Sequence, residues 1–226
     1  MQARKQRRRA VAIALAFLSA VGLVVAAFGD RWLTVPEYGG DSNPSSPFRP
    51  RSAAIGLRTF ERCKAGTCTQ MSNSDLIDVL EAEIETIKQA NLKLPAKEQL
   101  PLPRPPWHGF PVVGLMAFVF ALIAAAGLLV GGVLAAAGKR VELPIMPTTI
   151  AVLGLALSII TACIFIATKP DLTEALVVGW TFITYGVAAV VGLAAVFPLN
   201  RAIRPIDAEL GEAAATMSWG GSRDDQ

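Results

Sequence analysis

The chain has 226 residues, of which 53% are hydrophobic and 17% are charged, and its formal net charge at neutral pH is +3. Its mean hydropathy is +0.47. This profile is typical of a membrane protein with one extramembrane domain and argues against a water-soluble enzyme.

Four apolar runs are each long enough to cross a bilayer. A helix rises about 1.5 Å per residue and the hydrocarbon core is about 30 Å thick, so a span needs roughly 20 apolar residues. A backbone in lipid must satisfy its own hydrogen bonds, which favours helices for such continuous runs. The predicted spans are residues 10–28, 109–137, 147–167 and 172–198. The sequence therefore predicts an all-α membrane fold, a four-helix bundle with a small extracytoplasmic β-sheet and one further helix inserted between the first two spans.

Basic residues gather beside the spans at three places that belong to one side of the membrane. These places are the N-terminus (residues 1–9), the turn at 138–146 and the tail at 199–226, and their basic residues are Arg4, Lys5, Arg7, Arg8, Arg9, Lys139, Arg140, Arg201 and Arg204. Short loops rich in Lys and Arg stay in the cytoplasm. We therefore expect a multi-pass protein of the cell membrane with both termini cytoplasmic and a short outer turn at 168–171.

The basic N-terminus directly precedes a span, so we interpret it as a topology signal and expect no nucleic-acid partner. A cleaved signal peptide is the alternative for residues 10–28. The apolar run is longer than the usual signal-peptide core, however, and no small-x-small cleavage site precedes Asp30.

Residues 29–108 form the predicted extracytoplasmic domain. The segment 39–50 (GGDSNPSSPFRP) is rich in Gly, Ser and Pro and predicts an irregular loop. Residues 52–63 alternate as a strand does, and a turn containing Gly leads to a returning strand at 68–71. We therefore predict a β-hairpin over 52–71. A further strand is expected at 31–35.

Residues 74–91 have the pattern of an amphipathic helix. Leu76, Leu80, Ile84 and Ile87 recur at helical spacing, and Ser72 or Ser74 is placed to cap the N-terminus. Five acids make the exposed side negative and form a candidate surface for a partner: Asp75, Asp78, Glu81, Glu83 and Glu85.

The segment 95–106 contains five prolines and predicts a stiff, extended lead into the second span. Trp107 follows it, and Trp32 stands just after the first span. Because amphipathic rings settle at the membrane–water boundary, we expect both tryptophans to act as interfacial anchors.

The predicted spans carry no charged residue at mid-depth, which argues against a pump or a proton-coupled transporter. Small residues recur instead at every fourth position, where they allow helix backbones to approach. Packing within the monomer and contact with a partner helix both remain open for these stripes. They consist of Ala12, Ala16, Ala20, Gly127, Gly131, Gly154, Ser158, Ala162, Ala188 and Gly192.

Cys63 and Cys68 flank the predicted hairpin turn on the outer side, where thiols oxidise, so we predict a structural disulfide. The C-x4-C spacing does not match the C-x-x-C of a redox centre. Cys163 lies within a span and is expected to be a packing residue. His108 is the only histidine and has no ligand partners at metal spacing. We predict no catalytic, metal or cofactor site.

The arrangement of these residues resembles the claudin and peripheral myelin protein superfamily. Trp32 matches the tryptophan that follows the first span, Gly56-Leu57 matches the start of Gly-Leu-Trp, and Cys63 with Cys68 matches the cysteine pair. Arg58 replaces the last residue of that motif. The resemblance implies four helices, cytoplasmic termini, an outer sheet and a role in adhesion, barrier formation or modulation of a channel. Asn43 precedes Pro44 and so makes no glycosylation sequon, which favours a bacterial relative.

Three functional hypotheses follow. The first, which we favour, is a non-enzymatic scaffold, accessory subunit or cell-surface interaction protein, whose partners are the bilayer and another membrane protein or itself. The second is a permease-type subunit of an ATP-driven mechanotransmission or export complex, which needs more cytoplasmic surface than the nine residues before the first span and a short turn supply. The third is a four-helix thiol oxidoreductase, which the cysteine spacing and the single histidine disfavour.

Overall fold

The computed structural model describes residues 2–38, 51–64, 67–95, 97–138, 147–170 and 176–203. The predictions for the loop 39–50, most of the turn 138–146, part of the outer turn 168–171 and the tail beyond 203 lie outside the described residues.

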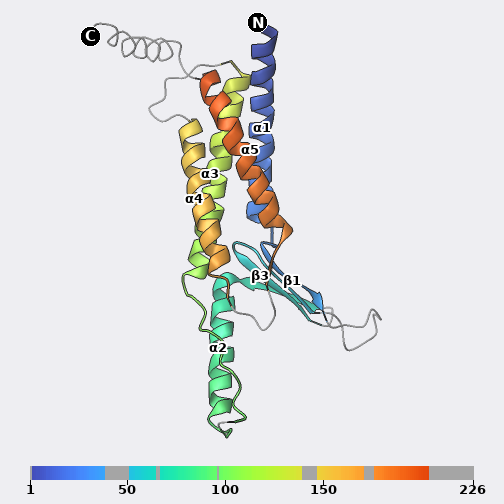
Figure 1. The fold of residues 1–226 in the computed structure, drawn as a ribbon, viewed down its shortest axis with the longest axis vertical. Helices are drawn as coiled ribbons and strands as arrows, with labels where there is room; N and C mark the ends of the chain where they lie inside the picture. Colours follow the sequence, from blue (N-terminus) through green and yellow to red (C-terminus); the bar gives the residue numbers. More distant parts are fainter. Residues whose placement is uncertain are drawn as a thin grey trace, which may run out of the picture.

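Four long helices run side by side as an elongated bundle (Figure 1). They are α1 (Gln2–Phe28), α3 (Phe110–Ala136), α4 (Pro147–Ala167) and α5 (Trp180–Ile203). Each contains a segment long and apolar enough to cross a membrane. The four predicted helices are confirmed, and α4 has the predicted bounds. The basic N-terminal segment was expected to precede the first helix. In the structure it is itself helical and forms the start of α1.

The fourth span was predicted with the wrong ends. Val177–Val178 is not helical but forms β5, which pairs with the strand β1 (Leu33–Tyr38), and α5 begins only at Trp180. The N–H of Gly179 donates to the carbonyl oxygen of Trp32 at 2.8 Å and holds β5 beside β1. At the other end α5 continues through Pro198 to Ile203. Leu199 and Ile203 are buried, so packing on the bundle outweighs the hydrogen bond that a helix loses at proline.

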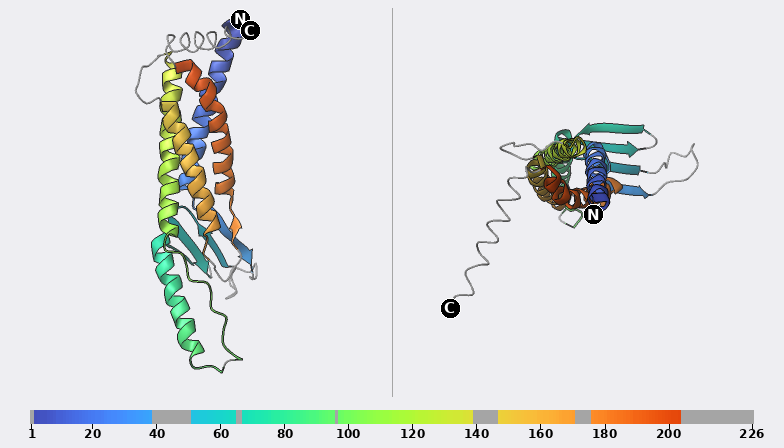
Figure 2. Two further views of the ribbon diagram at one scale, coloured as in Figure 1. Left: turned by 60° about the vertical axis from the view of Figure 1, so that its left-hand side comes forward. Right: turned by 90° about the horizontal axis from the view of Figure 1, so that it is seen from above.

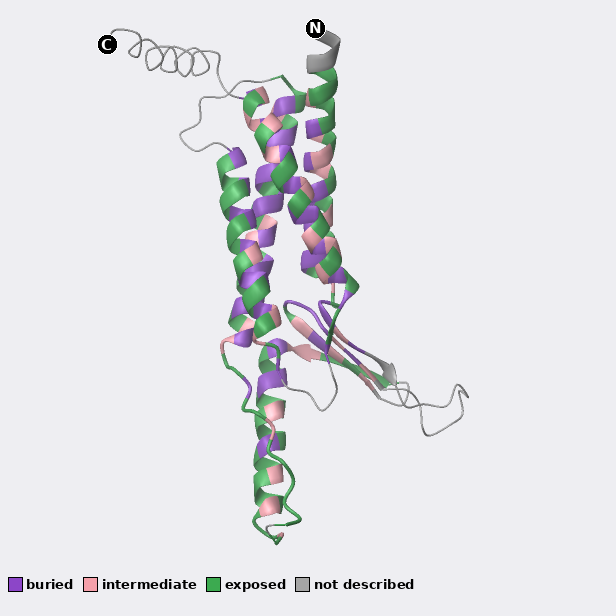
Figure 3. Cartoon of the chain, viewed as in Figure 1, coloured by how far each residue is buried: buried purple, intermediate pink, exposed green. Residues whose placement is uncertain are grey.

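The stripes of small residues lie at contacts between helices of the same chain. A Cβ at Gly154 would stand 2.8 Å from the backbone nitrogen of Ala124, so α3 and α4 approach closely at this point. Ser19 of α1 donates to the carbonyl oxygen of Ala188 in α5 at 2.7 Å. The stripe residues of all four helices are buried in the bundle (Figure 3). Packing within the monomer is therefore their observed role.

A five-stranded antiparallel sheet with the order β4-β3-β2-β1-β5 lies at the end of the bundle where α1 ends and α5 begins (Figure 1). Viewed from above, the sheet extends to one side of the four helices (Figure 2). Its longer strands are β1 (Leu33–Tyr38), β2 (Arg51–Ile55), β3 (Thr59–Lys64) and β4 (Thr67–Ser72). The expected extra strand near 31–35 is confirmed as β1.

The prediction of one continuous strand over 52–63 was wrong. The chain turns at Gly56-Leu57-Arg58, and Ile55 of β2 pairs with Phe60 of β3. Leu57 is buried, and the N–H of Gly56 donates to the carbonyl oxygen of Thr59 at 2.7 Å, so this turn is a compact anchor on the bundle. Residues 52–71 are accordingly three strands of a meander rather than one hairpin.

The acidic helix α2 (Asn73–Asn91) follows β4 and projects away from the bundle (Figures 1 and 2). Ser72 is its N-cap, and a capping box joins the Ser72 side chain to the N–H of Asp75 and the Asp75 carboxylate to the N–H of Ser72. The buried residues of α2 lie mainly towards its base: Asn73, Leu76, Ile77 and Ile84.

Candidate functional site

An apolar groove lies between α2, one face of the sheet and the proline-rich segment. Its cavity volume is about 360 Å³. We call it the outer groove. Its apolar lining consists of Ala53, Phe60, Met71, Leu76, Val79, Leu80, Ile84, Ile87, Pro101, Leu102, Pro103 and Pro106.

Two local features of the sequence form the walls of the outer groove. Phe60 of β3 pairs with Met71 of β4, and paired residues in a sheet point to the same face. The helical spacing of Leu76, Leu80 and Ile87 directs these side chains towards that face. The sheet and the apolar stripe of α2 thus meet.

The proline-rich segment forms the third wall of the outer groove, and Asn91, the last residue of α2, holds it in place. Its Nδ2 donates to the carbonyl oxygen of Leu100 at 2.8 Å, and its Oδ1 accepts from the N–H of Leu100 at the same distance. This pair of bonds returns the chain along α2, and the prolines that follow keep it extended. Leu102 is 52% exposed and Val79 is 39% exposed, so the outer groove remains open at its surface.

Charged side chains border the outer groove. Arg62 Nη1 lies 3.8 Å from Glu83 Oε1, and about half of each side chain is exposed. Arg104 also lines the groove. An exposed ion pair of this kind contributes little stability, so its main effect is to give the mouth of the groove a charge pattern.

The five predicted acids do not form one cluster. Asp75 belongs to the capping box, and Glu83 pairs with Arg62 across the groove. Asp78, Glu81 and Glu85 fall at i, i+3 and i+7, so they share one stripe of α2, which we call the acidic stripe. The apolar residues of the outer groove occupy the other side of the helix.

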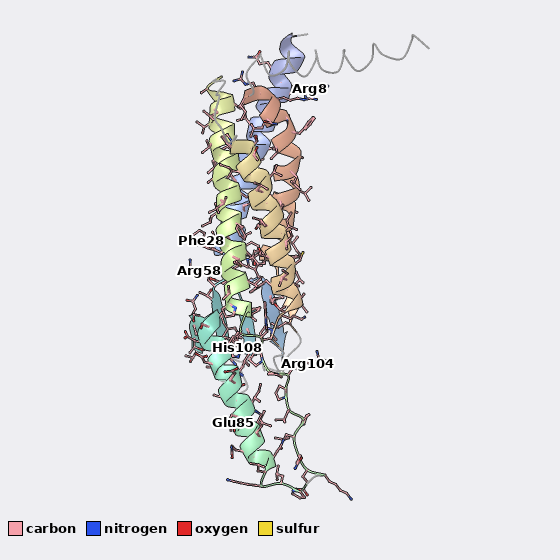
Figure 4. The ribbon with its side chains drawn as sticks, turned by 90° about the vertical axis from the view of Figure 1, so that its left-hand side faces the viewer. Arg8, Phe28, Arg58, Glu85, Arg104 and His108 are labelled. Atoms are coloured by element: carbon pink, nitrogen blue, oxygen red, sulfur yellow. A yellow bond between two sulfur atoms is a disulfide. The ribbon has the colours of Figure 1, made fainter. Side chains whose placement is uncertain are left out.

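Two members of the acidic stripe have polar partners. Glu81 Oε1 lies 3.1 Å from Nε2 of His108, an exposed contact that ties α2 to the start of α3 (Figure 4). The Glu85 carboxylate accepts from Gln89 at 3.0 Å and pairs with Lys88 at 3.5 Å. The bond from Gln89, with the charge and bond of Lys88, lowers the pKa of Glu85. Glu85 is therefore ionised at neutral pH.

Trp32 does not lie at the lipid surface, so its expected role as an interfacial anchor is corrected. Its side chain is fully buried and packs edge-on against Phe165 of α4 and Phe182 of α5. β5 pairs with β1 next to Trp32, so Gly179 and the sheet cover the Trp32 side chain. The sequence pattern did not indicate the pairing of β5 with β1. Trp107 is 48% exposed, and its role as an anchor stays a prediction.

The two other residues of the resemblance lie at the turn between β2 and β3. Gly56 approaches the Cα of Asp30, and a Cβ at this position would stand 3.0 Å from that atom. The carbonyl oxygen of Leu57 abuts Gly114 of α3, where a Cβ would lie 2.2 Å from it. Together they seat the sheet on the bundle.

Cys63 and Cys68 form the predicted disulfide, which joins β3 to β4. Glu61 lies near them, and its carboxylate and the two sulfurs fall within 4.8 Å of one another. Disulfide sulfurs are not thiolates, and only thiolates bind metals well. This group therefore does not fit a metal. Cys163 is exposed on α4 rather than packed in the bundle.

A scan against models of protein families found no match, and a search of curated proteins found no significant relative. The outer groove was not visible in the sequence either. Two of its walls have recognisable patterns in the sequence, the apolar stripe of α2 and the leucines and prolines of residues 100–106. Nothing local in the sequence indicated that these two segments face each other.

Proposed function

We propose that this chain is a non-enzymatic membrane scaffold or accessory subunit that binds another membrane protein through the outer groove and the acidic stripe. The observation that carries the proposal is the groove itself. It is apolar, open and placed on an extramembrane domain that four membrane-length helices hold beside the bilayer. Open apolar surface in a rigid setting is a common mark of a protein-binding site.

Charge identifies the kind of partner. The acidic stripe lies on the side of α2 opposite the groove, so a partner that wraps around α2 contacts both surfaces. Opposite charges across such an interface steer association and fix its register. The partner therefore carries apolar side chains flanked by Lys or Arg. The helices restrict the protein to the plane of the membrane, so a protein in the same membrane is the partner best placed to reach the groove.

The superfamily resemblance belongs to this proposal. A sheet with a disulfide between adjacent strands, seated on a bundle by Trp32, Gly56 and Leu57, supports a claudin-like outer domain. Cytoplasmic termini and a cell-membrane location are part of the same proposal. The oxidoreductase alternative receives no support, because Cys63 and Cys68 are adjacent-strand partners in a disulfide and the His108 side chain is engaged with Glu81 in an exposed contact.

The proposal is tested by site-specific photo-crosslinking in intact membranes from a probe at Val79. The expected adduct contains a membrane protein with a basic outer segment. Ile87→Gln changes the groove and Asp78→Lys changes the stripe, and each should reduce the adduct by roughly tenfold, which corresponds to about 1.4 kcal/mol. Lys97→Gln, which lies outside both surfaces, is the matched control. Adducts only with soluble proteins, or equal adducts in all variants, would overturn the proposal.

A further inference from the structure

Arg58 occupies an unusual place for a charged residue. It ends the turn between β2 and β3, and the N–H of Asn73 donates to its carbonyl oxygen at 3.1 Å. The adjacent Leu57 is buried against α3, so the turn holds Arg58 at the side of the bundle. Figure 4 shows Arg58 on the flank of α3, near Phe28 and well away from Arg8 at the opposite end of the bundle.

The guanidinium of Arg58 lies over an aromatic ring of a membrane-length helix. Its Cζ is 4.9 Å from the centroid of the Phe118 ring in α3. Phe118 in turn meets Phe28, the last residue of α1, edge to face at 5.1 Å. The charge therefore covers the seam between α1 and α3. The adjacent exposed positions of these helices are apolar: Val25, Phe28, Leu115 and Val119.

The position along α3 places this charge near the lipid headgroups. Phe118 stands eight residues after Phe110, so it lies about 12 Å from the start of the helix. The 27 residues of α3 span about 40 Å, against a hydrocarbon core of about 30 Å. If α3 is centred in the bilayer, Phe118 lies roughly 7 Å inside the hydrocarbon boundary. An arginine at this depth extends its head towards the phosphates.

Within the described residues Arg58 forms no ion pair. Asp30, the acid at the end of α1, accepts from the hydroxyl of Thr59 at 2.8 Å instead. A guanidinium beside lipid needs an anion, because a charge near hydrocarbon is costly when unpaired. Its planar fork matches two oxygens of one phosphate.

We propose that Arg58 and Phe118 form a binding site for the phosphate of an anionic phospholipid in the leaflet on the sheet side. Phosphatidylglycerol is the appropriate class, because its headgroup has no cation to compete with Arg58 for the phosphate. The acyl chains would lie along the apolar seam of α1 and α3. This site is independent of the outer groove and of its partner.

The test is native mass spectrometry of the full chain in mild detergent, with phosphatidylglycerol, phosphatidylcholine or inorganic phosphate added. The wild-type chain is expected to retain phosphatidylglycerol in preference to the other two. Arg58→Met keeps an unbranched side chain over Phe118 but removes the charge, and roughly a tenfold loss of bound phosphatidylglycerol is expected, as for a lost charge-assisted hydrogen bond. Arg58→Lys should bind with intermediate strength.

Arg62→Gln is the matched control, since Arg62 lies in the outer groove and should leave lipid binding unchanged. Thermal unfolding in lipid-free detergent shows whether Arg58→Met is folded, and Arg58→Lys supplies the comparison if it is not. Equal binding of phosphatidylglycerol by the wild-type chain and a folded Arg58 variant would overturn the assignment. Retention of inorganic phosphate as tightly as phosphatidylglycerol would overturn it as well, because it would show a free-anion site.

Discussion

The indole Nε1 of Trp32 donates a hydrogen bond of 2.8 Å to the carbonyl oxygen of Ala26. Ala26 lies in the last turn of α1, where carbonyl groups have no partner within the helix. Trp32 therefore caps the first helix with its own side chain while its ring fills the space between α4 and α5. One residue links the bundle to the sheet that begins at Leu33.

Replacement of Trp32 by Phe should destabilise the protein by about 0.5–1.5 kcal/mol, because the Ala26 carbonyl would lose the hydrogen bond from the indole and keep only the one from the N–H of Gly29 at 3.2 Å. Trp32→Ala should cost more, about 3–5 kcal/mol, since it also opens a cavity. Unfolding in mixed micelles with increasing SDS measures both changes. Trp107→Phe is the control, because Trp107 is half exposed, and a loss at that position as large as at Trp32 would contradict this account.

Gly154 and Gly186 form a matched pair for testing the close approach of the helices. A Cβ at Gly154 meets backbone atoms of Ala124 at 2.8 and 3.0 Å, whereas a Cβ at Gly186 meets nothing within 4 Å. Gly154→Ala should therefore cost about 1–3 kcal/mol, because α3 and α4 must separate. Gly186→Ala should be neutral or up to about 1 kcal/mol more stable, since Ala is the better helix former. Equal effects in a thermal unfolding assay would contradict close packing as the role of Gly154.

Removal of the disulfide should loosen the outer domain and leave the bundle intact. Cys63 and Cys68 are five residues apart, so the bridge closes a short loop and is worth about 2 kcal/mol in the chain-entropy model. The variant Cys63→Ser, Cys68→Ser should expose β3 and β4 to limited proteolysis at lower protease concentrations. Cys163→Ser is the control and should leave the digestion pattern unchanged. A phenotype in cellular thiol oxidation, with no change in proteolysis, would favour the oxidoreductase instead.

Local patterns in the sequence were sufficient for much of the fold. The four long helices follow from apolar length, and the start of α2 follows from Ser72 with an acid three residues later. These features depend on residues within a few turns of one another. The predicted cysteine pair is also local, since its members face each other across one turn.

What the sequence did not indicate depends on contacts between distant segments. Val178 pairs with Leu33, which is far from it in the chain, so an apolar β-branched pair before α5 was assigned to the span. The same contact buries Trp32. The break at Leu57 was missed because apolar alternation continues through the turn, and only the docking of Leu57 on α3 explains it.

The orientation of the protein in the membrane can be measured at two exposed alanines that lie at opposite ends of the molecule. Ala90 lies near the tip of α2, and Ala137 caps the far end of α3 beside the basic turn. Ala90→Cys and Ala137→Cys are made with Cys163 changed to Ser, so that the remaining native cysteines are held in the disulfide. On intact cells a membrane-impermeant maleimide should label residue 90 at once, because α2 is expected outside.

Residue 137 should react only after the cells are permeabilised, because the basic residues beside it are expected to retain that loop in the cytoplasm. Both variants should label equally in detergent, which confirms that each thiol is exposed and controls for differences in reactivity. The reverse pattern would place the sheet, the acidic stripe and the outer groove in the cytoplasm. The partner would then have to be sought among proteins of the inner face, since the charge pattern of the groove would be unchanged but would face a different compartment.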